Sequence, residues 1–153
     1  MDFTLDPRIE ELRLKVAAFV EQHVMPLEKD PANYDDHENL KESVVAGMQE
    51  KARAQGLWGF QMPKARGGQE TGVVGMAALY EEAARSPFGP LAFNCAPPDD
   101  GNMIVLNKIL SDAQKDRWLQ PIIDGKVRSA FAMTEPDGGC GSDPSLTYTS
   151  ATR

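Results

Sequence analysis

Residues 129–143 read SAFAMTEPDGGCGSD. The segment 127–133 predicts a β-strand that stops where Thr134, Glu135 and Pro136 begin. The turn that follows is rich in glycine, and small residues let a ligand approach the backbone, whose N–H groups can bind an anion. The sequence therefore predicts a ligand site where a strand ends beside a turn of small residues.

The side chains around this strand end are of the types that bind a flat, polar-edged molecule. Side chains alternate between the two faces of a strand, so Phe131 and Met133 share one face and Thr134 lies on the other. The hydroxyl and backbone N–H of Thr134 can bond acceptors on the edge of a heterocycle, while Phe131 or Met133 supplies apolar contact. In the turn, the Gly141 N–H and the Ser142 hydroxyl can reach a phosphate oxygen. An ordinary strand and glycine turn remains the simpler interpretation of these residues taken alone.

Upstream of the strand, apolar side chains repeat every three to four residues, which predicts helices. The expected helices cover 7–24, 38–55, 72–85 and 101–110, with a further one from residue 111 and a short helical turn around 91–94. We expect Asp6 to cap the first helix, Pro26 to end it and Thr71 to cap the third. Ser111 and Gln114 have the spacing of a capping box. The last helix is expected to turn four side chains inward: Trp118, Leu119, Ile122 and Ile123.

This order of elements predicts a mainly α fold. A helical domain over residues 1–125 would precede the opening strands of a β domain over residues 126–153, cut short early. A chain of 153 residues has room for one domain and little more. A lone strand cannot satisfy its own backbone N–H and C=O groups, so we expect it to pair with something else, fray or form a local hairpin.

Composition excludes several classes of partner. The formal net charge of −7 argues against binding to nucleic acid or to an anionic membrane surface. Two cysteines without a CxxC pair or a nearby histidine predict neither a disulfide framework nor a metal site. We expect Cys95 to be a small buried hydrophobe and Cys140 to be exposed. With no apolar run near the ~20 residues of a membrane span and no signal-like N-terminus, the sequence predicts a cytoplasmic protein, or a mitochondrial matrix protein after loss of a presequence.

Residues 129–143 resemble the flavin-binding segment of the acyl-CoA dehydrogenases, in which (F/Y)-(A/C)-(M/V/L)-T-E-P precedes a Gly/Ser-rich turn and Asp. Three upstream stretches resemble the same family in the same order: EKARAQGLWGFQMPKARGG (50–68), YEEAARSPFGP (80–90) and SDAQKDRWLQPIIDG (111–125). The stretch APPDDGNM (96–103) resembles the branch that includes the human members numbered ten and eleven. The likeness extends from about residue 7 to the last residue.

The resemblance implies an N-terminal helical domain, a middle β-barrel domain and a C-terminal four-helix domain, with FAD bound between them. It implies that Phe131, Met133 and Thr134 follow the pyrimidine edge of the flavin. Gly141 and Ser142 correspond to the turn near the pyrophosphate, with Ser142 also close to the CoA thioester. The turn is one or two residues longer than the usual family form, so several registers of the turn stay open.

The implied reaction is the α,β-dehydrogenation of an acyl-CoA, with hydride passing to flavin N5. The family places its catalytic glutamate in the C-terminal domain, so no residue here is assigned as the base, and we expect this fragment to be inactive alone. Asn94, Asn102 and Met103 are candidates for the substrate tunnel by their position, although ordinary packing explains them as well. The implied partners are acyl-CoA, electron-transfer flavoprotein or a similar acceptor, and further copies in a dimer or tetramer.

Two other functions fit the sequence. One is a catalytically inactive helical module that associates with other chains through exposed apolar surface. The other keeps the fold and changes the chemistry, as in the acyl-CoA oxidases and nitroalkane oxidases.

Overall fold

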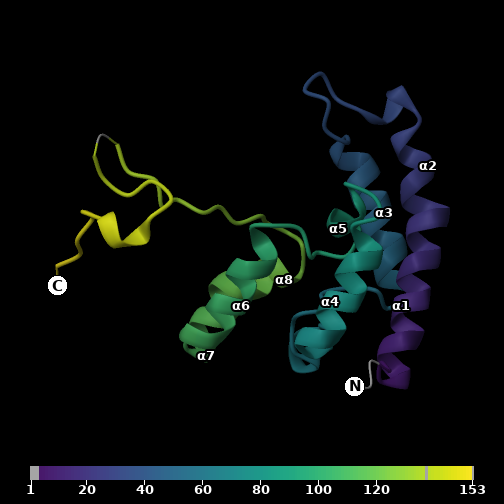
Figure 1. The fold of residues 1–153 in the computed structure, drawn as a ribbon, viewed down its shortest axis with the longest axis horizontal. Coiled ribbons are helices and arrows are strands. Elements are labelled where there is room, and N and C mark those ends of the chain that lie inside the picture. Colours follow the sequence, from purple (N-terminus) through teal and green to yellow (C-terminus); the bar gives the residue numbers. More distant parts are fainter. Residues whose placement is uncertain (1–3, 137, 153) are drawn as a thin grey trace.

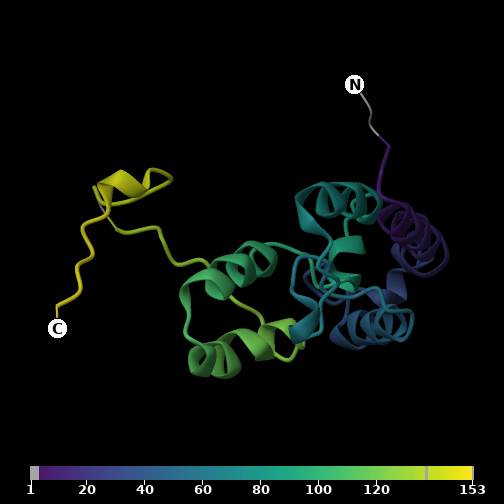
Figure 2. The same cartoon turned by 90° about the horizontal axis from the view of Figure 1, so that it is seen from below.

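The computed structural model describes residues 4–136 and 138–152 and consists of a helical body and a C-terminal segment that leaves it. In Figure 1 the helices up to α8 lie together, and the chain after them runs away to a small looped unit at its far end. Figure 2 shows the same separation from a direction at right angles. The mainly α fold is confirmed. Asp137 in the glycine-rich turn, residues 1–3 and Arg153 lie outside the described residues.

Helices make up almost all the secondary structure of the described chain. The first half of the body contains α1 (Pro7–Phe19), α2 (Met25–Glu28), α3 (Glu42–Ala54) and α4 (Gly72–Ala83). The second half contains α5 (Gly89–Ala92), α6 (Asp99–Ile109), α7 (Asp112–Gln114) and α8 (Gln120–Ile123). π-Helical turns cover Val20–Val24 and Lys115–Leu119, and 3₁₀ turns cover Pro31–Asn33, Lys64–Arg66 and Pro144–Leu146.

Several local predictions hold. Asp6 caps α1, because its carboxylate accepts a hydrogen bond of 2.9 Å from the backbone N–H of Arg8. Ser111 and Gln114 form the expected capping box at the start of α7.

The larger of two hydrophobic clusters lies among α1, α3, α4 and α5, and aromatic rings stand at its centre. Phe93 is fully buried, and its ring lies 5.2 Å from that of Phe19 and 5.3 Å from that of Phe60. The Phe93 carbonyl also accepts a 3.0 Å hydrogen bond from the Gly59 N–H. Phe93 therefore joins the loop after α5 to α1 and to the loop after α3.

A second cluster holds α6 against α8. Its buried members are Met62, Met103, Leu119, Ile122 and Ile123. Trp58 connects this cluster to α3, since its indole N–H donates to the Ile123 carbonyl at 2.8 Å and the Arg53 guanidinium stacks 3.4 Å above its ring. The two clusters are thus held together by side chains that bond to backbone carbonyls.

Two prolines continue helices that the sequence predicts they would distort or end. Each follows a π-helical turn, in which the residue before the proline donates its N–H five residues back, from Met25 to Val20 and from Gln120 to Lys115. A proline inside an α-helix lacks the N–H for a bond to residue i−4 and clashes with that carbonyl. The wider turn removes this conflict, so Pro26 and Pro121 lie at the second residue of α2 and α8.

Three helix details differ from the sequence predictions. The second helix begins at Glu42 rather than at Glu38, because Glu38 has φ of 62° and Leu40 forms an isolated antiparallel bridge with Tyr34. Thr71 does not cap α4, since its hydroxyl donates instead to the Phe60 carbonyl at 2.9 Å.

The third difference concerns Trp118, which was expected inside and is 54% exposed. Its neighbours Leu119, Ile122 and Ile123 are buried as predicted. Trp118 lies in the π turn, where the 3.6-residue period that would align it with Ile122 does not apply. The Arg117 guanidinium covers the exposed ring at 4.4 Å.

The strand expected over 127–133 is not formed, and no strand occurs among residues 4–136 and 138–152. No second segment of the described chain lies beside it to form a ladder of hydrogen bonds. The predicted opening of a β domain is therefore not seen, and a division at residue 125 stays a prediction.

Replacing Phe93 with alanine should lower the free energy of unfolding by about 3–5 kcal/mol, because the substitution empties the centre of the larger cluster. Phe131→Ala is the matched control, since that ring is 69% exposed and should change the free energy by less than about 0.5 kcal/mol. Urea denaturation followed by far-ultraviolet circular dichroism measures both. Equal losses in the two variants would contradict the assigned core.

Candidate functional site

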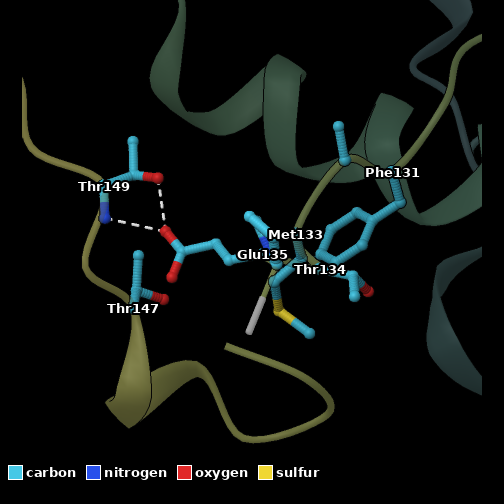
Figure 3. A pocket seen from close by; sticks show the side chains of 8 residues that line it. Phe131, Met133, Thr134, Glu135, Thr147 and Thr149 are labelled. Atoms are coloured by element: carbon cyan, nitrogen blue, oxygen red, sulfur yellow. Dashed lines mark hydrogen bonds between the residues drawn. The ribbon is translucent and has the colours of Figure 1, made fainter. Parts of the chain in front are cut away.

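An open hollow of about 560 Å³ lies in the C-terminal segment, away from the helical body. Its lining comes from the apolar run, from the Thr-Glu-Pro sequence and from the chain after the last 3₁₀ turn. The lining residues are Phe131, Ala132, Met133, Thr134, Glu135, Pro136, Thr147 and Thr149. Figure 3 shows the six labelled side chains around this hollow. Phe131, Met133 and Thr134 are thus brought together, as the sequence analysis requires of one site.

Phe131, Met133 and Thr134 offer different kinds of contact to a ligand. Phe131 is 69% exposed, so a large apolar ring lies open to solvent at the edge of the hollow. Met133 is half-buried, and Thr134 is exposed, with no hydrogen-bond partner for its hydroxyl among the described residues. A flat ligand in the hollow would find apolar surface on one part of the wall and a free hydroxyl on another.

Glu135 holds the hollow in shape. Its carboxylate accepts hydrogen bonds from the backbone N–H groups of Cys140 (3.0 Å), Tyr148 (2.9 Å) and Thr149 (2.7 Å), and from the Thr149 hydroxyl. Its own N–H donates to the Cys140 carbonyl at 2.7 Å. Figure 3 shows the Glu135 side chain directed at Thr149 and away from Phe131. One carboxylate therefore joins both arms of the loop.

These bonds stabilise the ionised carboxylate. The hydroxyl of Thr149 and the N–H groups of Tyr148, Cys140 and Thr149 together lower the pKa of Glu135 from 4.5 to about 2. A second carboxylate acts in the same way on a smaller scale, since Asp143 accepts from the Ser145 hydroxyl and N–H, which lowers the pKa of Asp143. Both loop turns are therefore held by charged acceptors.

Cys140 is buried, contrary to the expectation that it would be exposed. Its backbone is bonded to Glu135 on both sides, and its Sγ lies 3.2 Å from the Asp143 carbonyl and 3.4 Å from that of Gly141. The loop therefore folds around the thiol.

The other two predicted cofactor residues lie outside the lining of the hollow. Gly141 and Ser142 are exposed in the turn that follows Cys140, and the Ser142 hydroxyl has no partner among the described residues. They remain free to meet a ligand that extends beyond the hollow.

Two of the predicted substrate residues take part in packing. Asn94 is 8% exposed, adopts φ of 56° and donates its amide to the carbonyls of Ile122 (3.0 Å) and Ile123 (3.1 Å). Met103 is fully buried in the second cluster. Both residues connect α8 to the rest of the body, which is the plainer of the two roles that the sequence allowed.

Asn102 differs from Asn94 and Met103 because it lines a hollow. It is half-buried and lines a smaller space of about 240 Å³ with Val105, Leu106, Ser129 and Ala130. Its Nδ2 donates to the Ser129 hydroxyl at 2.8 Å. Asn102 therefore lies where the C-terminal segment, which follows α8, passes α6, and it is separate from the hollow around Thr134.

Thr147 and Thr149 complete the lining, although they were not among the predicted site residues. Their signal is the alternation Leu146-Thr147-Tyr148-Thr149, which places two hydroxyl side chains on one side of an extended chain. What the pattern could not indicate is the distance of this segment from Glu135, because the intervening turn sets it.

Among residues 4–136 and 138–152, no group of three or more His, Cys, Asp or Glu side chains is arranged to hold a metal ion. In the same part of the chain, none of the helices combines the length and the apolar character needed to cross a bilayer.

Comparisons with known proteins point to one family. The model described as "Acyl-CoA dehydrogenase, N-terminal domain" matches residues 6–126. Acyl-CoA dehydrogenase family member 11 of Gallus gallus is 40% identical over 134 residues, which cover 84% of this chain and 17% of that protein. Family member 10 of Mus musculus is 34% identical over 139 residues, covering 86% of this chain and 13% of that protein. This chain therefore spans less than a fifth of the length of these relatives.

A solved structure gives the same result. A Mycobacterium abscessus protein that carries the acyl-CoA dehydrogenase name superposes with a TM-score of 0.73 at 36% identity. The match covers 88% of this chain and 36% of that one. The family resemblance and the branch with members ten and eleven, both expected from the sequence, are confirmed.

The amide signals of Tyr148 and Thr149 should report the ionisation of Glu135. Since the pKa is lowered, the carboxylate stabilises the loop fully above about pH 4.5 and loses this effect as the pH falls through about 2. We expect the chemical shifts of both amide protons to change with a midpoint near pH 2 in an NMR titration.

Glu135→Gln is the matched control, because it keeps the shape of the side chain but cannot ionise. Its amide shifts should show no transition near pH 2. A midpoint near 4.5 in the unsubstituted chain would mean that the carboxylate is not bonded to these groups.

Proposed function

Since this chain belongs to the acyl-CoA dehydrogenase family, we propose that it forms part of an FAD-dependent enzyme that dehydrogenates acyl-CoA thioesters at their α,β carbons. One observation carries the proposal: Phe131, Met133 and Thr134 line a single hollow directly after the helical body that the family model matches. The relatives support the dehydrogenase over the oxidase and nitroalkane oxidase alternatives, because their names are those of dehydrogenases.

The residues of the hollow fit a flavin. An isoalloxazine ring is flat, and it has apolar faces and a pyrimidine edge with hydrogen-bonding groups. Phe131 and Met133 offer apolar surface, and the free hydroxyl of Thr134 offers a donor. The exposed Gly141 N–H and Ser142 hydroxyl lie in the turn assigned to the pyrophosphate, where anions are bound by backbone N–H groups.

When bound, FAD supplies the acceptor for the hydride that leaves the β-carbon of the substrate. The residues of this chain would bind and orient it: Thr134 would hold the ring edge, Phe131 and Met133 would exclude water from the apolar part, and Glu135 would keep the wall in place. Donors preorganised by the fold cost no reorganisation when the ligand arrives. No residue of this chain is assigned as the base that removes the α-proton.

The remaining assignments concern the substrate and the partners. We assign Ser142 to contact with the acyl-CoA near its thioester and Asn102 to the wall of the substrate tunnel, to which Asn94 and Met103 would contribute through the packing of α8 on the body. The complete protein would pass electrons to electron-transfer flavoprotein or a similar acceptor and would assemble as a dimer or tetramer.

One observation favours the second candidate, association with other chains. Val105 and Ile109 lie four residues apart on α6, so they share one face of the helix, and they are 52% and 69% exposed. Apolar side chains grouped on one helix face promote association when nothing covers them.

Saturable quenching of flavin fluorescence on titration with the chain tests the proposed cofactor site. Thr134→Ala and Ser142→Ala should each weaken FAD binding by about three- to tenfold, the effect of losing one hydrogen bond. Ser150→Ala is the matched control, because that residue is exposed and outside the lining. The absence of saturable binding by the unsubstituted chain would refute the proposal.

Sedimentation velocity over a range of concentrations tests the association. The unsubstituted chain should form species heavier than the monomer, and Val105→Asp with Ile109→Asp should shift it toward the monomer. Lys108→Asp, at an exposed position of the same helix, should leave the distribution unchanged. A monomer at every concentration would rule out this second function for the chain.

A further inference from the structure

A buried carboxylate at the start of α6 holds the point where the chain leaves the helical body. Asp99 is the first residue of α6 and is only 2% exposed. Its Oδ1 accepts hydrogen bonds from the backbone N–H of Ser129 at 2.6 Å and from the Ser129 hydroxyl at 2.7 Å, and its Oδ2 accepts from Nε of Arg128. A carboxylate buried in this way requires such partners, because an unpaired buried charge is costly.

The partners of Asp99 are themselves fixed by further bonds. The Ser129 hydroxyl, which donates to Asp99, also accepts from Nδ2 of Asn102 at 2.8 Å. Nη2 of Arg128 donates to the Pro97 carbonyl at 3.3 Å. Two successive residues of the departing chain are thereby bonded to the beginning and the first turn of α6.

These contacts are the last that tie the C-terminal segment to the body. Among the hydrogen bonds and ion pairs of residues 4–136 and 138–152, none joins a residue after Ser129 to the helical body. The further bonds of the segment all lie within it. Ser129 precedes Phe131 by two residues and Thr134 by five. The direction in which the hollow is presented to the body therefore depends on the bonds made at Asp99.

We propose that Asp99 is a positioning residue, which orients the flavin-contacting segment on the helical body through Ser129 and Arg128. This inference rests on the proposed function, since it assigns Asp99 a role in that same cofactor site. Asp99 does not touch the hollow, and it acts through the two residues that it holds.

The adjacent Asp100 supplies a matched comparison. It lies in the first turn of α6 beside Asp99, so both carboxylates have the same favourable interaction with the helix dipole. The Asp100 side chain makes no hydrogen bond or ion pair with the segment among the described residues. Asp100→Asn therefore removes a charge from the helix end and leaves the contacts to Ser129 and Arg128 intact.

Asp99→Asn is the principal test variant. It keeps the shape of the side chain but turns an amide NH₂ toward a donor, since one of its two terminal atoms can no longer accept. Arg128→Gln places an amide oxygen at the same distance along the side chain as Nε of arginine. The double variant Asp99→Asn with Arg128→Gln therefore rebuilds a neutral hydrogen bond with reversed polarity.

Two readouts separate positioning from stability. Amide hydrogen exchange at residues 127–134 measures the order of the segment, and flavin fluorescence quenching measures FAD affinity; the unfolding midpoint is recorded alongside. We expect Asp99→Asn to speed exchange of the Ser129 amide by roughly tenfold or more and to weaken FAD binding, as expected for loss of hydrogen bonds to a charged group. The double variant should recover much of both, and Asp100→Asn should change neither.

Ser129→Ala keeps the test decisive if Asp99→Asn fails to fold. It removes the hydroxyl but leaves the backbone N–H and Arg128 bonded to Asp99, and it should weaken protection and FAD binding by a smaller factor.

Unchanged exchange at 127–134 in Asp99→Asn, or in Ser129→Ala should Asp99→Asn not fold, would overturn the inference. Faster exchange in Asp99→Asn together with an unchanged FAD affinity would also overturn it, since Asp99 would then order the segment without serving the cofactor. Failure of the unsubstituted chain to bind FAD would instead refute the proposed function, and the role of Asp99 toward the cofactor with it. The titration of the unsubstituted chain therefore distinguishes the two failures.

Discussion

Backbone N–H groups in loops and in the interior need hydrogen-bond acceptors, and in this chain carboxylates are many of these acceptors. Asp99 accepts from the N–H of Ser129, and Glu135 accepts from three backbone N–H groups at once. Asp35 bonds the N–H groups of His37 and Asn39 in the loop before α3 in the same manner. Part of the acidic excess of the sequence is therefore structural, because these side chains satisfy backbone groups that neither a helix nor a strand satisfies.

The structure was predictable from the sequence where local chemistry decides it. The cap at Asp6 and the capping box at Ser111 depend on neighbours within three residues, and both formed as predicted. The sequence predictions were wrong where the helix period changes. The exposure of Trp118 and the continuation of the helix past Pro26 both follow from π turns, which a periodic pattern of apolar residues does not predict.

The strand over 127–133 failed for a different reason. Its residues favour an extended backbone, but pairing depends on a second segment that a local pattern cannot supply. The shared hollow of Phe131, Met133 and Thr134 was predictable, because these residues are close in sequence. The parts that depend on distant contacts, such as the burial of Cys140 and the arrival of Thr149 at Glu135, were not.

The two π turns have a consequence for how the helices register on the cores. Such a turn holds one residue more than an α turn, so the side chains after it are rotated by about 100° relative to a continuous α-helix. In the first helix, Met25 and Leu27 pack after this turn on the same cluster as Val16 and Val20. Regularising the turn without a deletion would rotate Met25 and Leu27 by about 100°, whereas removing one residue between Val20 and Val24 would turn the π turn into an α turn and leave both side chains on that cluster. The irregular turn is thus what keeps the apolar stripe in phase across the proline.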